Sequence, residues 1–208
     1  MKTQIAAQSV APSHLDAGQP VAAPRTITSW DIDSGHSSAQ FKVRHLMVSN
    51  VRGSLGAITG TVHIDEGDIT RSSVKVSIDA RGIDTREPKR DEHLRSADFL
   101  DVANHPDITF VSNAIHAAKG GDLEVSGDLT IRGVTKSVTM TVEALPPAVK
   151  DPWGNTKRGT VARAALNRQD FGLVWNVALE TGGVVVADRI DIEIEVELLK
   201  KDPSPTVA

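Results

Sequence analysis

The amino-acid sequence predicts an all-β protein, built as an antiparallel sandwich or barrel, and two observations carry this prediction. The first is strict alternation: from Arg189 to Leu199 apolar residues occupy every second position, and Asp191 and three glutamates stand between them. Successive side chains of a strand point to opposite faces, so this segment has one apolar and one hydrated face. The second is that similar segments recur along the chain with turn residues between them, which is typical of antiparallel sheets.

The strand pattern appears in eight segments, each of which combines apolar positions on one face with polar positions on the other. These segments are 41–48, 57–64, 74–80, 109–115, 123–131, 138–144, 158–166 and 189–199. Short glycine-containing stretches stand between several of them, including Glu66-Gly67-Asp68, Lys119-Gly120-Gly121-Asp122 and Arg132-Gly133. Glycine and aspartate tolerate the positive φ of tight turns, so these stretches are predicted to be turns. A longer loop is predicted from Pro146 to Asn155.

One segment, 87–99, breaks the alternation. It is rich in charge, and Pro88 suits the first turn of a helix. Leu94, Ala97 and Phe99 give it only a thin apolar stripe. The pattern predicts a short helix that packs across an end or edge of the sheet.

Composition limits the class of protein further. The chain has 208 residues, of which 39% are hydrophobic, enough for one globular domain with a sizeable core. The net charge of −4 gives no broad basic field, so no nucleic-acid partner is expected. Cysteine is absent, which excludes disulfides, thiol nucleophiles and thiolate metal sites.

The two ends of the chain are predicted to be tails. Residues 1–25 are dominated by Ala, Pro, Ser and Gln and are expected to be disordered, while residues 202–208 form a short C-terminal tail. Ile5-Ala6-Ala7 is too short an apolar run for a secretory signal. No run approaches the roughly 18 apolar residues of a membrane span. These observations predict a cytoplasmic protein with no integral membrane segment.

Five strings in a fixed order closely resemble the YceI family, also called the polyisoprenoid-binding or lipid-binding YceI-like proteins. They cover 41–46, 90–99, 105–110, 127–136 and 166–172, and the resemblance extends over about residues 27–201. The resemblance implies a domain at 26–201 that folds as a lipocalin-like, eight-stranded antiparallel barrel with one short helix. It also implies a long apolar cavity that holds an isoprenoid chain or similar amphiphile. Several family members are periplasmic, which makes the periplasm the family-based alternative for location.

Composition is compatible with an interior cavity. Aromatic residues are only 3% of the chain, and small barrels either fill with side chains or hold one ligand. From composition alone a packed β core is equally compatible, and the resemblance favours the cavity. We expect the ligand to contact inward-facing residues of the strands and the adjoining segments, namely Phe41, Val43, His45, Met47, Val76, Ile78, Phe110, Met140, Val142, Arg168, Phe171, Trp175, Ile192, Ile194 and Val196.

Two polar members of this set have alternative roles. His45 is expected on the apolar face between Val43 and Met47, either bonded to a ligand head group or satisfied within the core. Arg168 either neutralises a phosphate or quinone oxygen, or pairs with Asp170 in a structural turn that Asn167 caps.

Catalytic and metal-binding residues are not predicted. No nucleophile elbow or pair of carboxylates at acid–base spacing appears. His93, His105 and His116 have spacings that match no compact ligand pattern.

The sequence therefore predicts a non-catalytic carrier of a long apolar chain, with no cofactor other than a bound isoprenoid or other lipid. One alternative is a stress-response or structural partner that uses the barrel as a scaffold and the N-terminal tail for docking. Another is a histidine-dependent barrel enzyme. Leu46 and Val48, on the polar side of their predicted strand, suggest a patch through which a homodimer forms.

Overall fold

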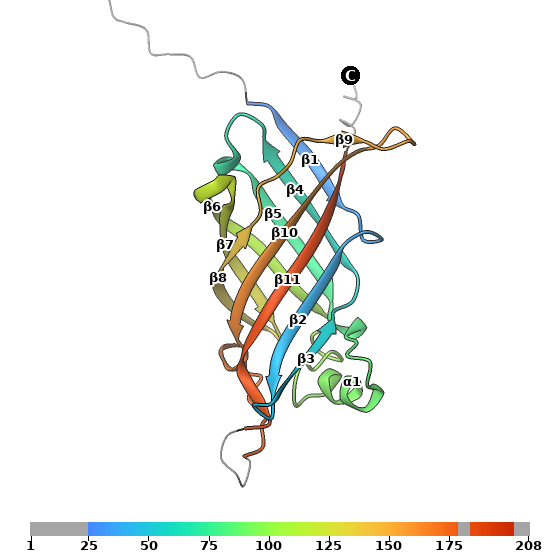
Figure 1. The fold of residues 1–208 in the computed structure, drawn as a ribbon, viewed down its shortest axis with the longest axis vertical. Helices are drawn as coiled ribbons and strands as arrows, with labels where there is room; N and C mark the ends of the chain where they lie inside the picture. The colour runs from blue at the N-terminus through green and yellow to red at the C-terminus, as the bar shows by residue number, and fades with distance from the viewer. Residues whose placement is uncertain (1–24, 179–183, 202–208) are drawn as a thin grey trace, which may run out of the picture.

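The computed structural model describes residues 25–178 and 184–201 of the chain. Within them, strands dominate, with one α-helix and four short 3₁₀ helices (Figure 1). The strands are β1 (Ile27–Ile32), β2 (Ser38–His45), β3 (Ser49–Ser54), β4 (Ile58–Asp65), β5 (Ser73–Asp79), β6 (Asp107–Ala117), β7 (Leu123–Ile131), β8 (Val134–Val142), β9 (Val149–Lys150), β10 (Thr156–Asn167) and β11 (Val186–Lys200). The helices are α1 (Pro88–Arg95) and the 3₁₀ helices Ile69–Arg71, Ala80–Gly82, Lys119–Gly121 and Arg168–Phe171.

Eight of the strands close into an antiparallel barrel, which confirms the predicted fold. Around the barrel the order is β11, β1, β4, β5, β6, β7, β8 and β10, and β10 then pairs with β11 again. That closing pair is long, running from Lys157 opposite Leu199 to Asn167 opposite Arg189. Closure leaves none of these eight strands as a free edge along its whole length, which limits aggregation through unpaired backbone groups.

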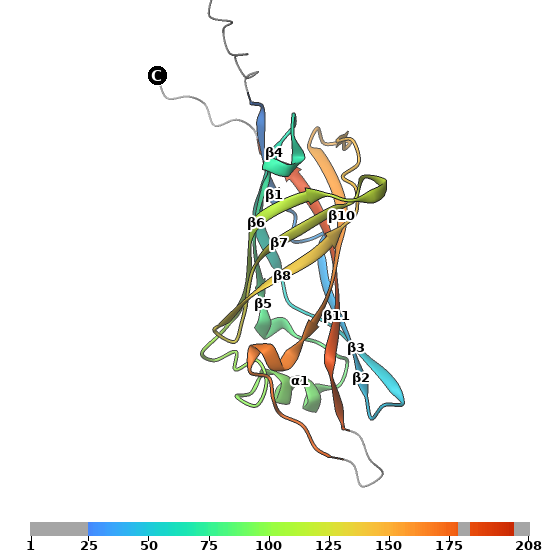
Figure 2. The ribbon, with the colours of Figure 1, turned by 90° about the vertical axis from the view of Figure 1, so that its left-hand side faces the viewer.

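The strands β2 and β3 extend the wall at one end of the barrel. Strand β1 pairs with the end of β11 at residues 198–200, and β2 then takes over the same edge from Glu195 to Val186. Strand β3 pairs with β2, and its last residue, Ser54, also forms a bridge with Asp84. The β2–β3 hairpin projects from the barrel towards the end that carries α1 (Figures 1 and 2). This end is called the helix end below.

The hairpin turn corrects one sequence prediction. We expected a single strand through 41–48 with Met47 on its inner face, but β2 ends at His45 and the chain reverses at Leu46 and Met47. Both residues have positive φ, 50° and 58°, a conformation that costs bulky side chains roughly 1–3 kcal/mol. The sequence concealed this turn because apolar residues stand where asparagine or glycine is usual.

Helix α1 packs across one end of the barrel, as predicted, but it is shorter than the predicted segment. The side chain of Glu87 caps its start by accepting hydrogen bonds from the backbone N–H groups of Lys89 and Arg90. The helix ends at Arg95 because Ser96 adopts an extended conformation (φ −70°, ψ 174°). Phe99, assigned to the helix from the sequence, is instead in the following turns and is buried.

The predicted tails, 1–25 and 202–208, lie outside the described residues except for Arg25. In the part of the chain that the structure describes, no helix has both the length and the apolar character needed to cross a bilayer.

Candidate functional site

The interior of the barrel contains two neighbouring chambers, with volumes of about 120 Å³ and 150 Å³. The smaller one lies towards the end of the barrel opposite α1 and is called the upper chamber. The larger one, the lower chamber, lies towards the helix end and is walled partly by Leu94 of α1. Both chambers share five wall residues, so they meet at a ring formed by Ile78, Ile108, Leu129, Met140 and Ile194. The exposed surface inside both is apolar.

Alternation along β11 explains how the sequence builds this wall. Ile192 and Ile194 face the lower chamber, and Val196 and Leu198 face the upper one. The carboxylates between them point outward, where Asp191 and Glu193 pair with Lys42 and Arg163. Although they face inward, Ile192, Ile194 and Val196 are only half-buried. Apolar side chains that face the interior and still expose surface indicate empty space, so the barrel is not filled by its own side chains.

Twelve of the fifteen residues predicted to contact a ligand line these chambers. Val76, Phe110, Val142 and Val196 line the upper chamber. The lower chamber is lined by Phe41, Val43, Arg168, Phe171 and Ile192, and the shared ring contains Ile78, Met140 and Ile194.

Three predicted residues lie elsewhere. Met47 is 54% exposed in the hairpin turn. His45 is half-buried at the end of β2, opposite Ser49, and is not part of either chamber wall. Trp175 packs edge-to-face on His93, with ring centroids 4.8 Å apart, and beside Phe99 at 5.3 Å. This aromatic group lies behind the lower chamber, where Phe99 alone contributes to the wall.

Arg168 is the one charged side chain in the chamber walls of the described residues, and its side chain is only 3% exposed. Its Nε donates to Ala187 O (3.1 Å), and its Nη1 donates to the carbonyls of Leu173 and Trp175. Its Nη2 donates to Val186 O (3.4 Å) and to Asp188 Oδ1 (3.1 Å).

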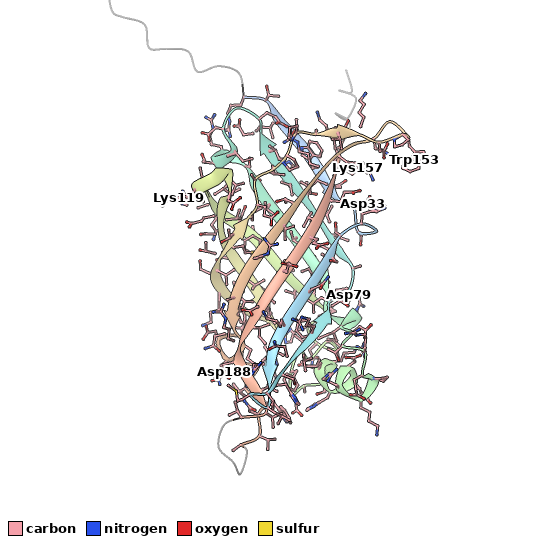
Figure 3. The ribbon with its side chains drawn as sticks, in the orientation of Figure 1. Asp33, Asp79, Lys119, Trp153, Lys157 and Asp188 are labelled. Carbon is pink, nitrogen blue, oxygen red and sulfur yellow. The ribbon has the colours of Figure 1, made fainter. Side chains whose placement is uncertain are left out.

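These five bonds engage the five N–H groups that a guanidinium has. No donor is left for a phosphate or quinone oxygen, so the geometry favours the structural role of Arg168. Its carboxylate partner is Asp188, at the helix end of β11 (Figure 3), rather than the predicted Asp170. Asn167 caps the turn as expected, because its Oδ1 accepts from the backbone N–H of Gln169 at 3.0 Å.

Several residues of the lower chamber were not predicted from the sequence. Leu55, Ile83, Leu100 and Leu173 come from segments between the strands. Short connecting segments have no regular periodicity, so no sequence signal distinguishes their inward residues from their outward ones.

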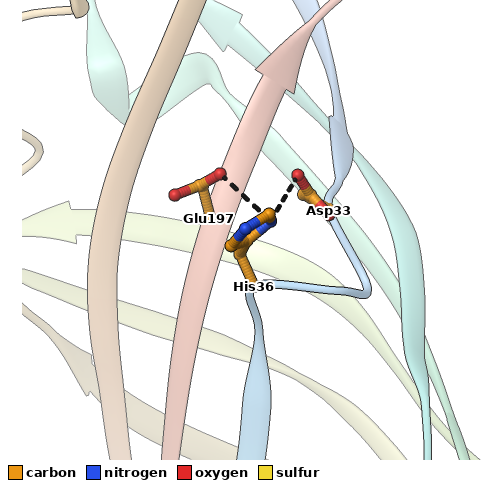
Figure 4. A group of neighbouring side chains, drawn as sticks. All are labelled: Asp33, His36 and Glu197. Atoms are coloured by element: carbon orange, nitrogen blue, oxygen red, sulfur yellow. Dashed lines mark hydrogen bonds and ion pairs between the residues drawn. The ribbon is translucent and has the colours of Figure 1, made fainter. Parts of the chain in front are cut away.

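One group of side chains that could hold a metal ion lies outside the barrel, at the upper end, and had no signal in the sequence. Asp33, His36 and Glu197 place their ligand atoms within 4.8 Å of one another (Figure 4). His36 Nδ1 lies 3.0 Å from Asp33 Oδ2, a hydrogen bond that holds the pKa of Asp33 below its ordinary value. The ammonium of Lys157 lies 2.7 Å from Glu197 Oε1 and 3.5 Å from Asp33 Oδ2. This cation already neutralises the two carboxylates, and it would repel a second one.

Comparisons with known proteins agree with this architecture. A UPF0312 protein of Vibrio cholerae is 35% identical over 171 residues, which are 82% of this chain and 86% of the relative. The crystal structure of the Campylobacter jejuni YCEI protein has a TM-score of 0.65 and 26% identity, covering 76% of this chain and 90% of that one. A polyisoprenoid-binding domain from Saccharophagus degradans has a TM-score of 0.60 and 13% identity, covering 84% of this chain and 99% of that one, and it shows likeness of fold.

The match to the family itself covers most of the chain. The YceI-like domain matches residues 30–198, which run from within β1 to near the end of β11. The protein therefore belongs to the family of YceI-like domains.

Proposed function

We propose that this protein is a non-catalytic carrier that encloses a long apolar chain, such as an isoprenoid, an isoprenoid quinone or a fatty-acid-like amphiphile. The observation that carries the proposal is the pair of adjoining apolar chambers inside the closed barrel. Burying a methylene group stabilises a complex by about 0.8 kcal/mol, so an apolar lumen needs no polar contact to bind a chain. The Saccharophagus degradans domain of similar fold, described as polyisoprenoid-binding, supports this choice of ligand class.

The composition of the chamber walls supports binding rather than catalysis. Within residues 25–178 and 184–201, the walls contain no aspartate, glutamate, lysine or histidine. General acid–base chemistry needs such a group within hydrogen-bond reach of the substrate. The saturated donors of Arg168 add a second point: a charged head group would find no partner in the lumen, so the enclosed part of the ligand is uncharged.

The test fills the lumen and asks whether binding is lost. Ala164 lines the lower chamber, whereas its neighbour Ala165 is exposed on the outer face of the same strand. The full chain and the variants Ala164→Phe and Ala165→Phe are incubated with geranylgeraniol, a linear prenol, and examined by native mass spectrometry. We expect one bound prenol on the unaltered protein and on Ala165→Phe, and at least tenfold weaker binding to Ala164→Phe.

The proposal is refuted if the unaltered protein binds neither the prenol nor a long-chain quinone or fatty acid. It is also refuted if both phenylalanine variants bind equally well, because the ligand would then lie outside the lumen.

A further inference from the structure

The helix end of the barrel exposes a group of large apolar side chains that the lumen does not use. Two segments contribute them, the β2–β3 turn and the segment after the Arg168–Phe171 helix. We call this group the tip patch, and it consists of Leu46, Met47, Val48, Val174 and Val177. Their exposed fractions range from 39% for Leu46 to 74% for Val48. Isolated exposed apolar residues need no explanation, but a contiguous set marks a surface that meets a partner.

Backbone hydrogen bonds hold the two segments of the tip patch next to each other. Leu46 N donates to Val185 O at 2.8 Å, and Val185 N donates to Val177 O at 3.1 Å. The two contributing segments are therefore joined through the start of β11. Both lie at the same end of the molecule in two perpendicular views (Figures 1 and 2).

The segments that carry the tip patch also contribute residues to the wall of the lower chamber. Val43, Leu173 and Val186 all line that chamber. Leu173 and Val186 are the immediate chain neighbours of Val174 and Val185, and Val43 stands three residues before Leu46. An apolar chain that left the lumen at the helix end would pass from these residues onto the patch.

The charged residues of the hairpin that carries part of the patch are of one sign. The whole β2–β3 hairpin, residues 38–54, contains Lys42, Arg44 and Arg52 and no acidic residue, in a chain whose net charge is −4. Lys42 and Arg52 are register partners on the outer face, and like charges directly opposite each other are destabilising. Lys42 pairs with Asp191 at 3.0 Å, whereas neither arginine forms an ion pair within the described residues. An anionic surface would neutralise these two arginines.

The opposite end of the barrel also exposes large apolar side chains, namely Ile27, Val149 and Trp153, but the charge beside them differs. Trp153 is 83% exposed there and points away from the barrel on the loop before β10 (Figure 3). The neighbouring Lys157 is surrounded by the carboxylates of Asp33, Asp151 and Glu197. An anionic partner is therefore disfavoured next to Trp153 and Lys157.

We propose that the tip patch docks on the surface of an anionic phospholipid bilayer, with its apolar side chains in the interface and Arg44 and Arg52 against the headgroups. This proposal rests on the proposed function, because docking brings the lower chamber against the bilayer from which the apolar chain enters. Basic side chains next to an anionic leaflet and apolar side chains at its boundary both strengthen such binding.

The experiment is co-sedimentation of the full chain with vesicles of phosphatidylcholine, or of phosphatidylcholine mixed with phosphatidylglycerol. The variants are Met47→Ser with Val48→Ser at the patch, and Arg44→Gln with Arg52→Gln beside it. Matched controls at the upper end are Trp153→Ser and Lys150→Gln. All these side chains are exposed, and thermal melting checks that each variant folds.

We expect binding to the mixed vesicles but at least tenfold weaker binding to pure phosphatidylcholine. The patch variant should lose at least tenfold in partitioning, and each arginine about fivefold. The upper-end controls should not change it. The docking proposal is overturned if the unaltered protein binds neither vesicle, if it does not prefer the anionic one, or if Trp153→Ser is the variant that loses binding.

Two further readouts separate the alternatives. If the patch variant turns a dimer into a monomer in analytical ultracentrifugation and leaves vesicle binding unchanged, the patch is an interface between copies and the proposal is wrong. Uptake of detergent-dispersed geranylgeraniol without vesicles tests the proposed function separately. Retained uptake with failed docking overturns only the docking proposal, whereas failed uptake with intact docking overturns the carrier function.

Discussion

Replacing Arg168 by methionine tests whether its guanidinium holds the helix end of the barrel together. Four of its acceptors are backbone carbonyls of the 173–175 and 186–187 segments, and the fifth is the carboxylate of Asp188. Methionine retains the apolar part of the side chain and removes every donor. If each of the four carbonyls loses about 1 kcal/mol after partial rehydration, the variant is destabilised by about 4 kcal/mol. For a domain of this size that lowers the melting temperature by about 8–16 °C.

Circular dichroism during heating measures this difference, and Arg189→Met is the matched control. Arg189 is on the same strand as Asp188 and is 73% exposed, and among the described residues it forms one ion pair, with Asp191 at 2.9 Å. Such a pair contributes about 0–1 kcal/mol, so the control should lower the melting temperature by no more than about 4 °C. If Arg168→Met melts within the range of the control, the five hydrogen bonds do not stabilise the fold and the structural role assigned to Arg168 is wrong.

Three further predictions concern other parts of the barrel. Asp65 is 2% exposed, and it accepts a hydrogen bond from Arg25 that holds the pKa of its carboxyl below the ordinary 3.8. The ionised carboxylate therefore stabilises the fold fully above pH 3.8, and this stabilisation is lost as pH falls through the lower pKa of the folded state. Asp65→Asn should therefore lower the urea midpoint at neutral pH, and a difference that does not narrow below pH 3.8 would contradict this assignment. Gly82→Ala would place its Cβ 2.4 Å from the Cα of Gly56 and should lower the free energy of unfolding in urea by about 1–3 kcal/mol. As a control, Gly159→Ala would place its Cβ 3.6 Å from the carbonyl oxygen of Val196 and should leave the urea midpoint unchanged. Met47→Gly removes the strain of a φ of 58° and should raise the unfolding free energy by about 0.5–1 kcal/mol while it weakens vesicle binding; a lower midpoint would show that the turn is not strained.

The sequence predicted the inward-facing residues of the barrel well in strands that have one hydrated and one apolar face. Ile192, Ile194 and Val196 could be placed on the inner wall because their neighbours are carboxylates that must remain in water. The same rule failed for Met47, because an apolar residue in an exposed turn continues the alternation of the strand before it. The remaining differences came from contacts between distant segments. The partner of Arg168 is on another strand, and a sequence pattern that relates only near neighbours pointed to Asp170 instead.

The lining of the lower chamber was predictable from the sequence only where it comes from regular strands or from the helix. Strand residues such as Phe41 and Val43 follow the two-residue period, and Leu94 was expected on the thin apolar stripe of the helix. Leu55 and Ile83 reach the chamber only because the connecting segments fold back over the helix end of the barrel. That arrangement depends on how the whole chain closes, which local periodicity does not encode.

The ring where the two chambers meet affects how the protein would distinguish ligands by length. A chain short enough for one chamber would gain affinity with each added methylene, at about 0.8 kcal/mol apiece, until that chamber is full. We expect the next carbons to meet the side chains of the ring, among them the flexible Met140, and to gain less until these side chains move aside. A plot of affinity against chain length should therefore rise, level off and rise again, and the position of the plateau would locate the ring from solution measurements alone.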